Sequence, residues 1–398
     1  MSSTSSPYQL LASHFDKIGD LEDIAEISSW DEATVMPEGG GRARGKSLAT
    51  LSGTIHELKT DQRIKEWLSL TDGDNSLDSW QKANVLEIKK IFKEASAIPV
   101  ELAKAIELSS SKSEQAWRHH RADNDWTSMQ PHLTALVGLV RERASILAST
   151  KQSTPYDALL DQYEPGVTAK SINTEFNKLK TFLPDFISEV EEAQNSKTTL
   201  PINGRFPLKL QERLGKKIMG VMGFDFNRGR LDISHHPFCG GIPDDTRITT
   251  RYNEENFTES LMGVIHETGH ALYQQGLPTH WRNQPVGEAR SMAMHESQSL
   301  IMEMQACRSA EFLSFLTPLV QDTFAGEQRD SKQWSTQNLK RLYLQVKRDF
   351  IRVDADELTY PLHIILRFEI ERDLINGDIE VKDIPELWDL KMFEYLSL

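Results

Sequence analysis

The sequence predicts a mainly α-helical protein that carries a small β element beside one buried helix. Apolar residues recur every three or four positions over most of the 398 residues, which is the spacing of one helix face. The spacing changes to strict alternation only between Phe224 and Arg251, and alternation is typical of short strands. No internal repeat, low-complexity tract or clear linker interrupts this pattern.

The N-terminal half is expected to be a series of amphipathic helices. The first spans about 8–32 and ends at a breaker cluster of proline and glycines over 37–41. The polar stretch 112–125 is expected to be a solvated face or a connection, and 154–168, with two prolines and a glycine, is expected to be a loop. Further helices are predicted over 42–60, 78–96, 100–110, 132–149, a segment around 176–186, and 208–222.

The C-terminal half begins with two predicted strands, 230–234 and 247–252, which flank a turn region at Gly240 and Gly241. A strand at this place could hold an extended peptide by main-chain hydrogen bonds. Helices are then predicted over 261–276, 287–306, 334–350, 360–374 and 384–396.

The segment 261–278 carries the most specific motif, an H-E-x-x-H pattern from His266 to His270. On a helix, positions i and i+4 lie on one face, so both imidazoles can bind one zinc ion. Glu267 then lies beside the metal, where a carboxylate can take the proton of metal-bound water. The surrounding residues are apolar nearly all round, which predicts a buried helix. The alternative is that the two histidines fall into register by chance on a core helix.

A catalytic zinc site usually has three protein ligands and one open position. In the class with a third histidine, glycine and histidine stand at positions 273 and 276, but this chain has Tyr273 and Gly276. The other common solution is a glutamate on the next helix. The sequence therefore predicts a His2Glu site completed from the helix over 287–306.

Glu296 is the preferred third ligand, because it shares one side of that helix with other residues at helical spacing. Glu288 and Glu303 are weaker candidates. His295 is either a core histidine or a substrate contact.

Five separated motifs follow one another along the chain. They are His236-Pro-Phe238, Asp245-Thr-Arg247-Ile-Thr249, His266-Glu-Thr-Gly-His270, His295-Glu-Ser-Gln298 and Ile351-Arg352-Val-Asp-Ala-Asp356. In identity, order and spacing they resemble those of the carboxypeptidase Taq family of zinc metallocarboxypeptidases. The resemblance runs from about Tyr8 to the last residue.

The resemblance implies a large helical body with a deep groove and the metal at its floor. It implies one metallopeptidase domain over 1–398, in which 1–200 covers the groove and 201–398 is the catalytic part. The implied activity is hydrolysis of C-terminal residues from peptides that have a free C-terminus. Zn2+ is the implied metal, for which Co2+ can substitute, and the implied assembly is a homodimer.

A carboxypeptidase must bind the terminal carboxylate of its substrate, and a guanidinium can do so with two hydrogen bonds. Family analogy and apolar helical surroundings make Arg352 and Arg367 the candidates. The alternative for both is a buried salt bridge with Asp354, Asp356 or Glu371.

Three further residues are candidates for substrate contact. Arg247 has Asp245 two positions away, so an ion pair is an equal alternative. His236 and Tyr360 either line the groove or belong to the core. The partners that orient the ligand imidazoles are not evident from sequence, and the acidic residues of the 351–356 motif are only guesses for them.

Members of the resembled family continue beyond the point where this chain stops, with a G-x-x-Q motif and an aromatic segment that line the groove. A catalytically impaired metal-binding homologue is therefore an alternative to an active carboxypeptidase. A zinc endopeptidase or oligopeptidase with the same ligands is another. An intact Glu267 favours catalysis, because a scaffold does not need a base beside its metal.

Composition narrows the possible partners. The formal net charge is −14, which argues against nucleic acid and anionic membranes, because both attract clustered positive charge. Two cysteines do not make a disulfide framework. No basic segment followed by an apolar one opens the chain, and no apolar run has the length of a membrane span, so a cytoplasmic location is expected.

Overall fold

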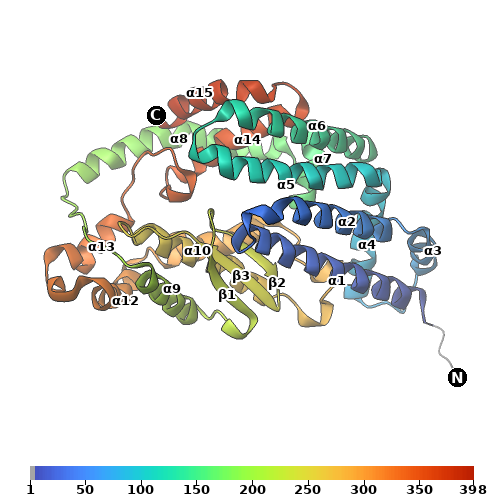
Figure 1. The fold of residues 1–398 in the computed structure, drawn as a ribbon, viewed down its shortest axis with the longest axis horizontal. Coiled ribbons are helices and arrows are strands. Elements are labelled where there is room, and N and C mark those ends of the chain that lie inside the picture. The colour runs from blue at the N-terminus through green and yellow to red at the C-terminus, as the bar shows by residue number, and fades with distance from the viewer. Residues whose placement is uncertain (1–4) are drawn as a thin grey trace. The chain divides into compact units, whose positions relative to one another are not determined.

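The computed structural model describes residues 5–398 and confirms a mainly helical fold with a small sheet (Figure 1). Tertiary contacts divide the chain into two compact units. The first comprises Met1–Thr168, Leu277–Ser291 and Asp373–Lys382, and the second comprises Ala169–Gly276, Met292–Arg372 and Asp383–Leu398. The expected division of one domain near residue 200 stays a prediction.

The first unit consists of helices, and its long N-terminal segment up to Thr168 is drawn in blue to green in Figure 1. Two of them begin with a capping box: Ser6 and Asp78 each accept from the backbone three residues ahead, where a glutamine side chain bonds back. Leu11, Phe15 and Ile88 belong to its buried apolar cluster. The helices are α1 (Pro7–Thr34), η1 (Glu38–Gly40), α2 (Gly41–Lys59), α3 (Gln62–Thr71), α4 (Ser79–Ala97), α5 (Val100–Ala122), α6 (Trp126–Lys151), α7 (Pro155–Tyr163), η3 (Thr279–Trp281) and η4 (Pro285–Gly287).

Two expectations for this unit are wrong. For 112–125 the connection is wrong, because α5 runs on to Ala122. The alternative, a solvated face, agrees with the exposure of Lys112 and of residues 121–124, although Ser113 is buried. Gln115 Nε2 donates to Glu32 Oε1 at 3.2 Å, and Arg118 Nη1 donates to the Glu32 carbonyl at 3.1 Å. The supposed loop 154–168 contains α7, since Pro155 occupies the first helical turn, where proline is tolerated.

The second unit contains the sheet, the helix of the H-E-x-x-H pattern and the C-terminal helices. Its elements are α8 (Ala169–Asn195), α9 (Leu208–Met222), η2 (Phe226–Arg228), β1 (Gly229–Ile233), β2 (Cys239–Ile242), β3 (Asp245–Thr250), α10 (Thr258–Gln275), α11 (Met292–Leu300), the π-helix η5 (Ile301–Ala306), α12 (Ala310–Val320), the π-helix η6 (Gln321–Ala325), η7 (Gly326–Gln328), η8 (Lys332–Trp334), α13 (Thr336–Tyr343), η9 (Arg352–Asp354), most of α14 (Tyr360–Asn376) and α15 (Ile384–Leu396). The last residues of α14 and most of η10 (Val381–Asp383) belong to the first unit.

The sheet has the strand order β1-β3-β2, with β1 parallel and β2 antiparallel to β3. The two predicted strands are present, and the expected turn at Gly240 and Gly241 is instead part of the third strand, β2. β3 is paired on both sides, with Ile248 opposite Leu231 and Cys239. Only β1 and β2 therefore have a free edge for an added peptide strand.

Helix α10 is buried on two sides, as its apolar composition predicts. One side packs on the sheet, where Val264 joins Leu231 and Ile248 in a core cluster. The other side contributes Leu261 and Ile265 to a larger cluster with α9, α12 and α13. A helix held on both sides presents its polar residues at a fixed place.

The predicted helix over 334–350 is wrong in its second half, because α13 ends at Tyr343. Beyond this point, backbone N–H groups bond to side chains: Val346 N donates to Gln194 Oε1 at 2.8 Å, and Lys347 N donates to Asp356 Oδ2 at 3.0 Å. These side-chain oxygens replace the carbonyl acceptors that a longer helix would offer to the same backbone donors. Within residues 5–398, no helix has both the length and the apolar composition that crossing a bilayer requires.

Candidate active site

Side chains from α10 and α11 converge on one point in the second unit. His266 Nε2 lies 3.8 Å from Glu296 Oε1, and His270 Nε2 lies 3.3 Å from Glu296 Oε2. One ligand atom from each residue lies within 4.8 Å of the others. Donors about 2.0–2.1 Å from a tetrahedral zinc ion lie about 3.4 Å apart. The three side chains therefore fit a single metal ion.

The Nδ1 atoms of the two histidines face away from this point and are already engaged. His266 Nδ1 contacts Glu303 Oε2 at 2.9 Å, and His270 Nδ1 contacts His295 Nδ1 at 2.7 Å. If His270 Nε2 binds a metal, its proton is on Nδ1, so His295 Nδ1 must accept. Both Nε2 atoms are thus left for the metal.

The two glutamates of the site, Glu296 and Glu267, have pKa values shifted in opposite directions. Burial opposes ionisation of Glu296, but the hydrogen bond with His270 and the charge of His266 lower the Glu296 pKa to about 2. Burial raises the pKa of Glu267, although the two histidines oppose the rise. A metal-binding carboxylate must be deprotonated, and a general base must accept a proton. The two glutamates therefore have environments suited to different tasks.

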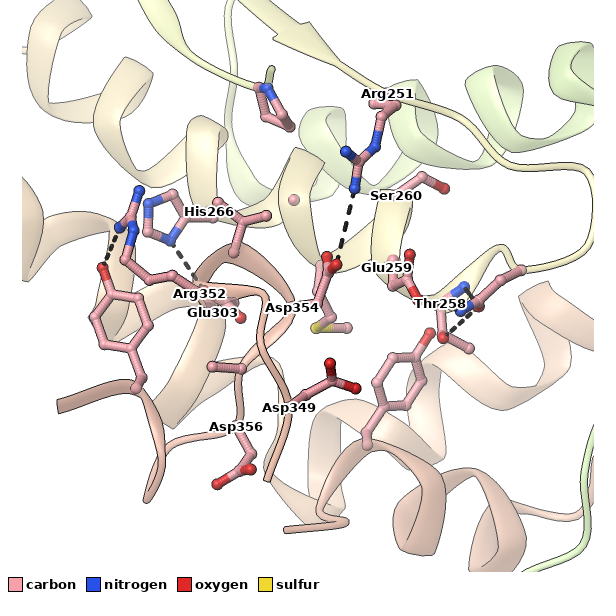
Figure 2. Close-up of a pocket in the computed structure, with 18 of the residues that line it drawn as sticks. Arg251, Thr258, Glu259, Ser260, His266, Glu303, Asp349, Arg352, Asp354 and Asp356 are labelled. Carbon is pink, nitrogen blue, oxygen red and sulfur yellow. Dashed lines mark hydrogen bonds and ion pairs between the residues drawn. The ribbon is translucent and has the colours of Figure 1, made fainter. Parts of the chain in front are cut away.

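A cavity of about 450 Å3 adjoins these residues (Figure 2). Its lining includes His266 and Glu267 from α10, Glu303 from η5, and Arg352 and Tyr360 from the segment that leads into α14. Glu267 is only 7% exposed. The cavity thus gives a substrate of peptide size access to the proposed base and to one ligand.

Helices α10 and α11 approach each other very closely at Gly269. A Cβ atom at this position would lie 2.6 Å from the Gln298 carbonyl oxygen and 2.6 Å from Ser299 Cα. Only glycine permits such backbone contact without displacement. The close approach brings Glu296 within reach of the two histidines.

Comparison with known proteins identifies the family. The sequence profile described as carboxypeptidase Taq (M32) metallopeptidase matches residues 10–398. The chain belongs to this family. The resemblance inferred from the five motifs is confirmed, and this M32 chain is a metallocarboxypeptidase.

Individual relatives agree along nearly the whole chain. Thermostable carboxypeptidase 1 of Thermus thermophilus is 34% identical over 98% of this M32 chain and 78% of its own length. Carboxypeptidase 1 of Bacillus subtilis is 34% identical over 96% of this chain and 76% of its own length. The solved structure of Trypanosoma cruzi metallocarboxypeptidase 1 matches with a TM-score of 0.89 at 39% identity, covering 98% of this chain and 78% of that one.

The predicted substrate residues of the M32 chain fall into two groups. Tyr360 Oη donates to Glu296 Oε1 at 3.2 Å and accepts from Arg352 Nη1 at 3.0 Å, so both lie next to the metal point. Arg367 Nη1 donates to the His363 carbonyl at 2.7 Å, and its guanidinium lies 4.4 Å from the Trp388 ring centroid. In the part of the chain that the structure describes, neither arginine forms the salt bridge considered as the alternative.

The other candidates have different surroundings. Arg247 forms a bidentate ion pair with Asp245, at 3.0 and 2.6 Å. His236 lines the cavity. Glu288 lies in the first unit and is not part of the metal group. Glu303 faces the Nδ1 side of His266, away from the metal point.

The guessed orienting partners, Asp354 and Asp356, do not contact the ligand imidazoles. Asp354 lies 3.8 Å from Arg251 across the cavity (Figure 2), and Asp356 accepts from the backbone of Leu358 and Thr359. Glu303 and His295 contact the Nδ1 atoms of His266 and His270 instead. A signal was available for Glu303: it follows Glu296 by seven residues, which is two helical turns on the same face.

Proposed function

We propose that the chain is a zinc carboxypeptidase in which His266, His270 and Glu296 hold the metal. The observation that carries this proposal is the convergence of both Nε2 atoms on Glu296, while both Nδ1 atoms are engaged elsewhere. A bound Zn2+ or Co2+ ion would polarise the scissile carbonyl and lower the pKa of water.

Glu267 is the proposed general base. Its carboxylate accepts a proton from the attacking water and delivers it to the nitrogen of the leaving amine. The supporting observations are its position beside the ligand His266, its 7% exposure and the pKa raised by burial. A raised pKa makes the protonated form, which must act as the acid in the second step, easier to reach.

Arg352 and Arg367 are the proposed partners of the substrate's terminal carboxylate. Burial and the neighbouring charge of Arg352 lower the Arg367 pKa to about 10, so these two cations are close together. Nearby like charges are stabilised by a shared anion. Arg352 lines the cavity and is the better candidate for direct contact. Arg367, held against Trp388 and the His363 carbonyl, is the better candidate for a supporting role.

The remaining candidates are assigned by what they touch. Tyr360 hydrogen-bonds Glu296 and lines the cavity, so we assign it to the substrate side of the site. His236 lines the same cavity and is a weaker candidate. His295 contacts His270 and Arg247 pairs with Asp245, so both are better explained by local structure than by substrate binding.

The deciding experiment uses purified protein loaded with Zn2+ or Co2+ and an N-blocked peptide in free and amidated forms, with and without chelator. Stepwise loss of C-terminal residues from the free peptide alone, abolished by the chelator, is the expected result. Cleavage of the amidated peptide would instead favour an endopeptidase. A metal-loaded protein that cleaves neither peptide would favour the impaired homologue.

Assembly and location are also proposals. We propose a cytoplasmic homodimer that binds peptides and neither nucleic acid nor membranes. The dimer rests on family resemblance, and the net charge of −14 weighs against anionic partners. The unpaired thiols of Cys239 and Cys307 are compatible with a reducing compartment. Light scattering tests the dimer, and cell fractionation tests the location.

A further inference from the structure

Glu303 connects a metal ligand to a buried arginine. Its Oε2 atom lies 2.9 Å from His266 Nδ1, and its Oε1 atom accepts from Arg308 Nη2 at 2.6 Å. The side chains of Glu303 and Arg308 are each only 11% exposed. Each carboxylate oxygen therefore has its own partner, and neither is free to rotate toward solvent.

The contact is incompatible with Glu303 as a fourth ligand at the same point. The two nitrogens of an imidazole point to opposite edges of the ring, and Glu303 is at the Nδ1 edge. Glu296 and His270 Nε2 are at the Nε2 edge. A single ion bound by His266 and His270 through Nε2 therefore cannot also be bound by Glu303.

A carboxylate at this edge determines the form of the imidazole. It accepts a proton from Nδ1, so the neutral ring keeps its lone pair on Nε2, and it fixes the ring plane. Arg308 fixes the carboxylate in turn by a charge-assisted hydrogen bond. We propose that Glu303, anchored by Arg308, is a positioning residue that orients His266 for the metal, an inference that rests on the proposed metal site.

The local backbone supports this assignment. Glu303 lies in the π-helix η5, which continues directly from α11. π-helical turns insert a residue into the helical register and often occur at functional sites. Since η5 packs on α10, one continuous helical segment supplies both the ligand Glu296 and the positioning residue Glu303. The two histidines have different partners at Nδ1: His266 contacts the Glu303 carboxylate, whereas His270 contacts the imidazole of His295.

The test compares wild-type protein with Glu303→Gln, Glu303→Asp and the double variant Glu303→Gln/Arg308→Met. Zinc affinity is measured by chelator competition, and the Co2+ d–d absorption spectrum reports the ligand geometry. Loss of a side chain that hydrogen-bonds to a metal ligand typically weakens the affinity for the metal 10–100-fold. Glu303→Gln is expected to fall in that range with an altered Co2+ spectrum, and Glu303→Asp is expected to recover part of the loss.

The controls separate positioning from folding. In Glu303→Gln, the buried Arg308 loses its carboxylate partner. The double variant also removes this arginine, so it should be thermally more stable than Glu303→Gln in the metal-free state but should bind metal equally weakly. Glu311→Gln, an exposed glutamate in the first turn of α12, should leave both measurements unchanged. Affinity within twofold of wild type and an unchanged Co2+ spectrum in Glu303→Gln would overturn the proposal. Since neither readout uses peptide, failure of the proposed peptidase activity would be recognised separately.

Discussion

The contact between α10 and α11 at Gly269 predicts the effect of one added methyl group. Gly269→Ala would place a Cβ atom 2.6 Å from Ser299 Cα and from the Gln298 carbonyl oxygen. Carbon atoms pack at about 3.5–4.0 Å, so the two backbones must separate by about 1 Å. Glu296 then moves away from His270 Nε2, from which it now lies 3.3 Å.

The structure also supplies the matched control. Gly263 lies on the same helix, and a Cβ atom there meets only Thr250 Oγ1 at 3.9 Å, which is ordinary contact. Gly263→Ala should stabilise the helix by about 0.5–1 kcal/mol, because alanine loses less backbone entropy than glycine. Overpacking in Gly269→Ala should cost about 1–3 kcal/mol. The two variants should therefore differ in unfolding free energy by about 1.5–4 kcal/mol, with opposite signs relative to wild type.

Urea unfolding of the metal-free proteins measures this difference, and chelator competition measures zinc affinity. Gly269→Ala is expected to bind zinc at least about tenfold more weakly, since a ligand displaced by about 1 Å no longer has coordination geometry. Gly263→Ala should bind zinc like wild type. Equal stability and equal zinc affinity for the two variants would refute the argument from backbone approach.

Three further outcomes follow from the site and its support. Glu267→Gln should keep one zinc per chain, measured by elemental analysis, and lower kcat by at least about 100-fold; normal turnover would exclude it as the base. Arg352→Met should raise KM for free-acid peptides about 10–100-fold, as loss of a charge-assisted contact predicts; an unchanged KM would remove Arg352 from the substrate site. Glu369, buried on α14, accepts from Lys180 and Lys391, which outweigh burial and lower its pKa from 4.5 to about 2. A lowered folded-state pKa adds stability above pH 4.5, about 3 kcal/mol at neutral pH, and this is lost as pH falls toward 2. Urea unfolding should thus show a destabilised Glu369→Gln at pH 7 and a difference smaller by about 2 kcal/mol at pH 3; a difference independent of pH would contradict the linkage.

Local patterns in the sequence were sufficient for most elements of the fold. Helices α9 and α15 begin and end at the predicted residues, over 208–222 and 384–396, where the apolar spacing is regular. Two of the errors, in α5 and α13, occurred where polar side chains have tertiary partners. The polar C-terminal half of α5 forms a helix because Gln115 and Arg118 bond to Glu32, and α13 ends early because Gln194 and Asp356 take backbone donors. Glu32 and Gln194 are 83 and 152 residues away from Gln115 and Val346, so no local pattern contains these contacts.

The candidate site divides in the same way. The spacing of His266 and His270 places two ligands on one face of a helix, and that relation is local, so the sequence alone predicts it. The choice of Glu296 over Glu288 and Glu303 depends on how α11 crosses α10 at Gly269, which is a contact between separate segments. The roles of Glu303 and His295 at the Nδ1 atoms depend on the same crossing. The sequence determined which chemical groups this protein carries, whereas the packing of two helices decided which side chains converge on the proposed metal point and which ones contact the Nδ1 atoms of its histidines.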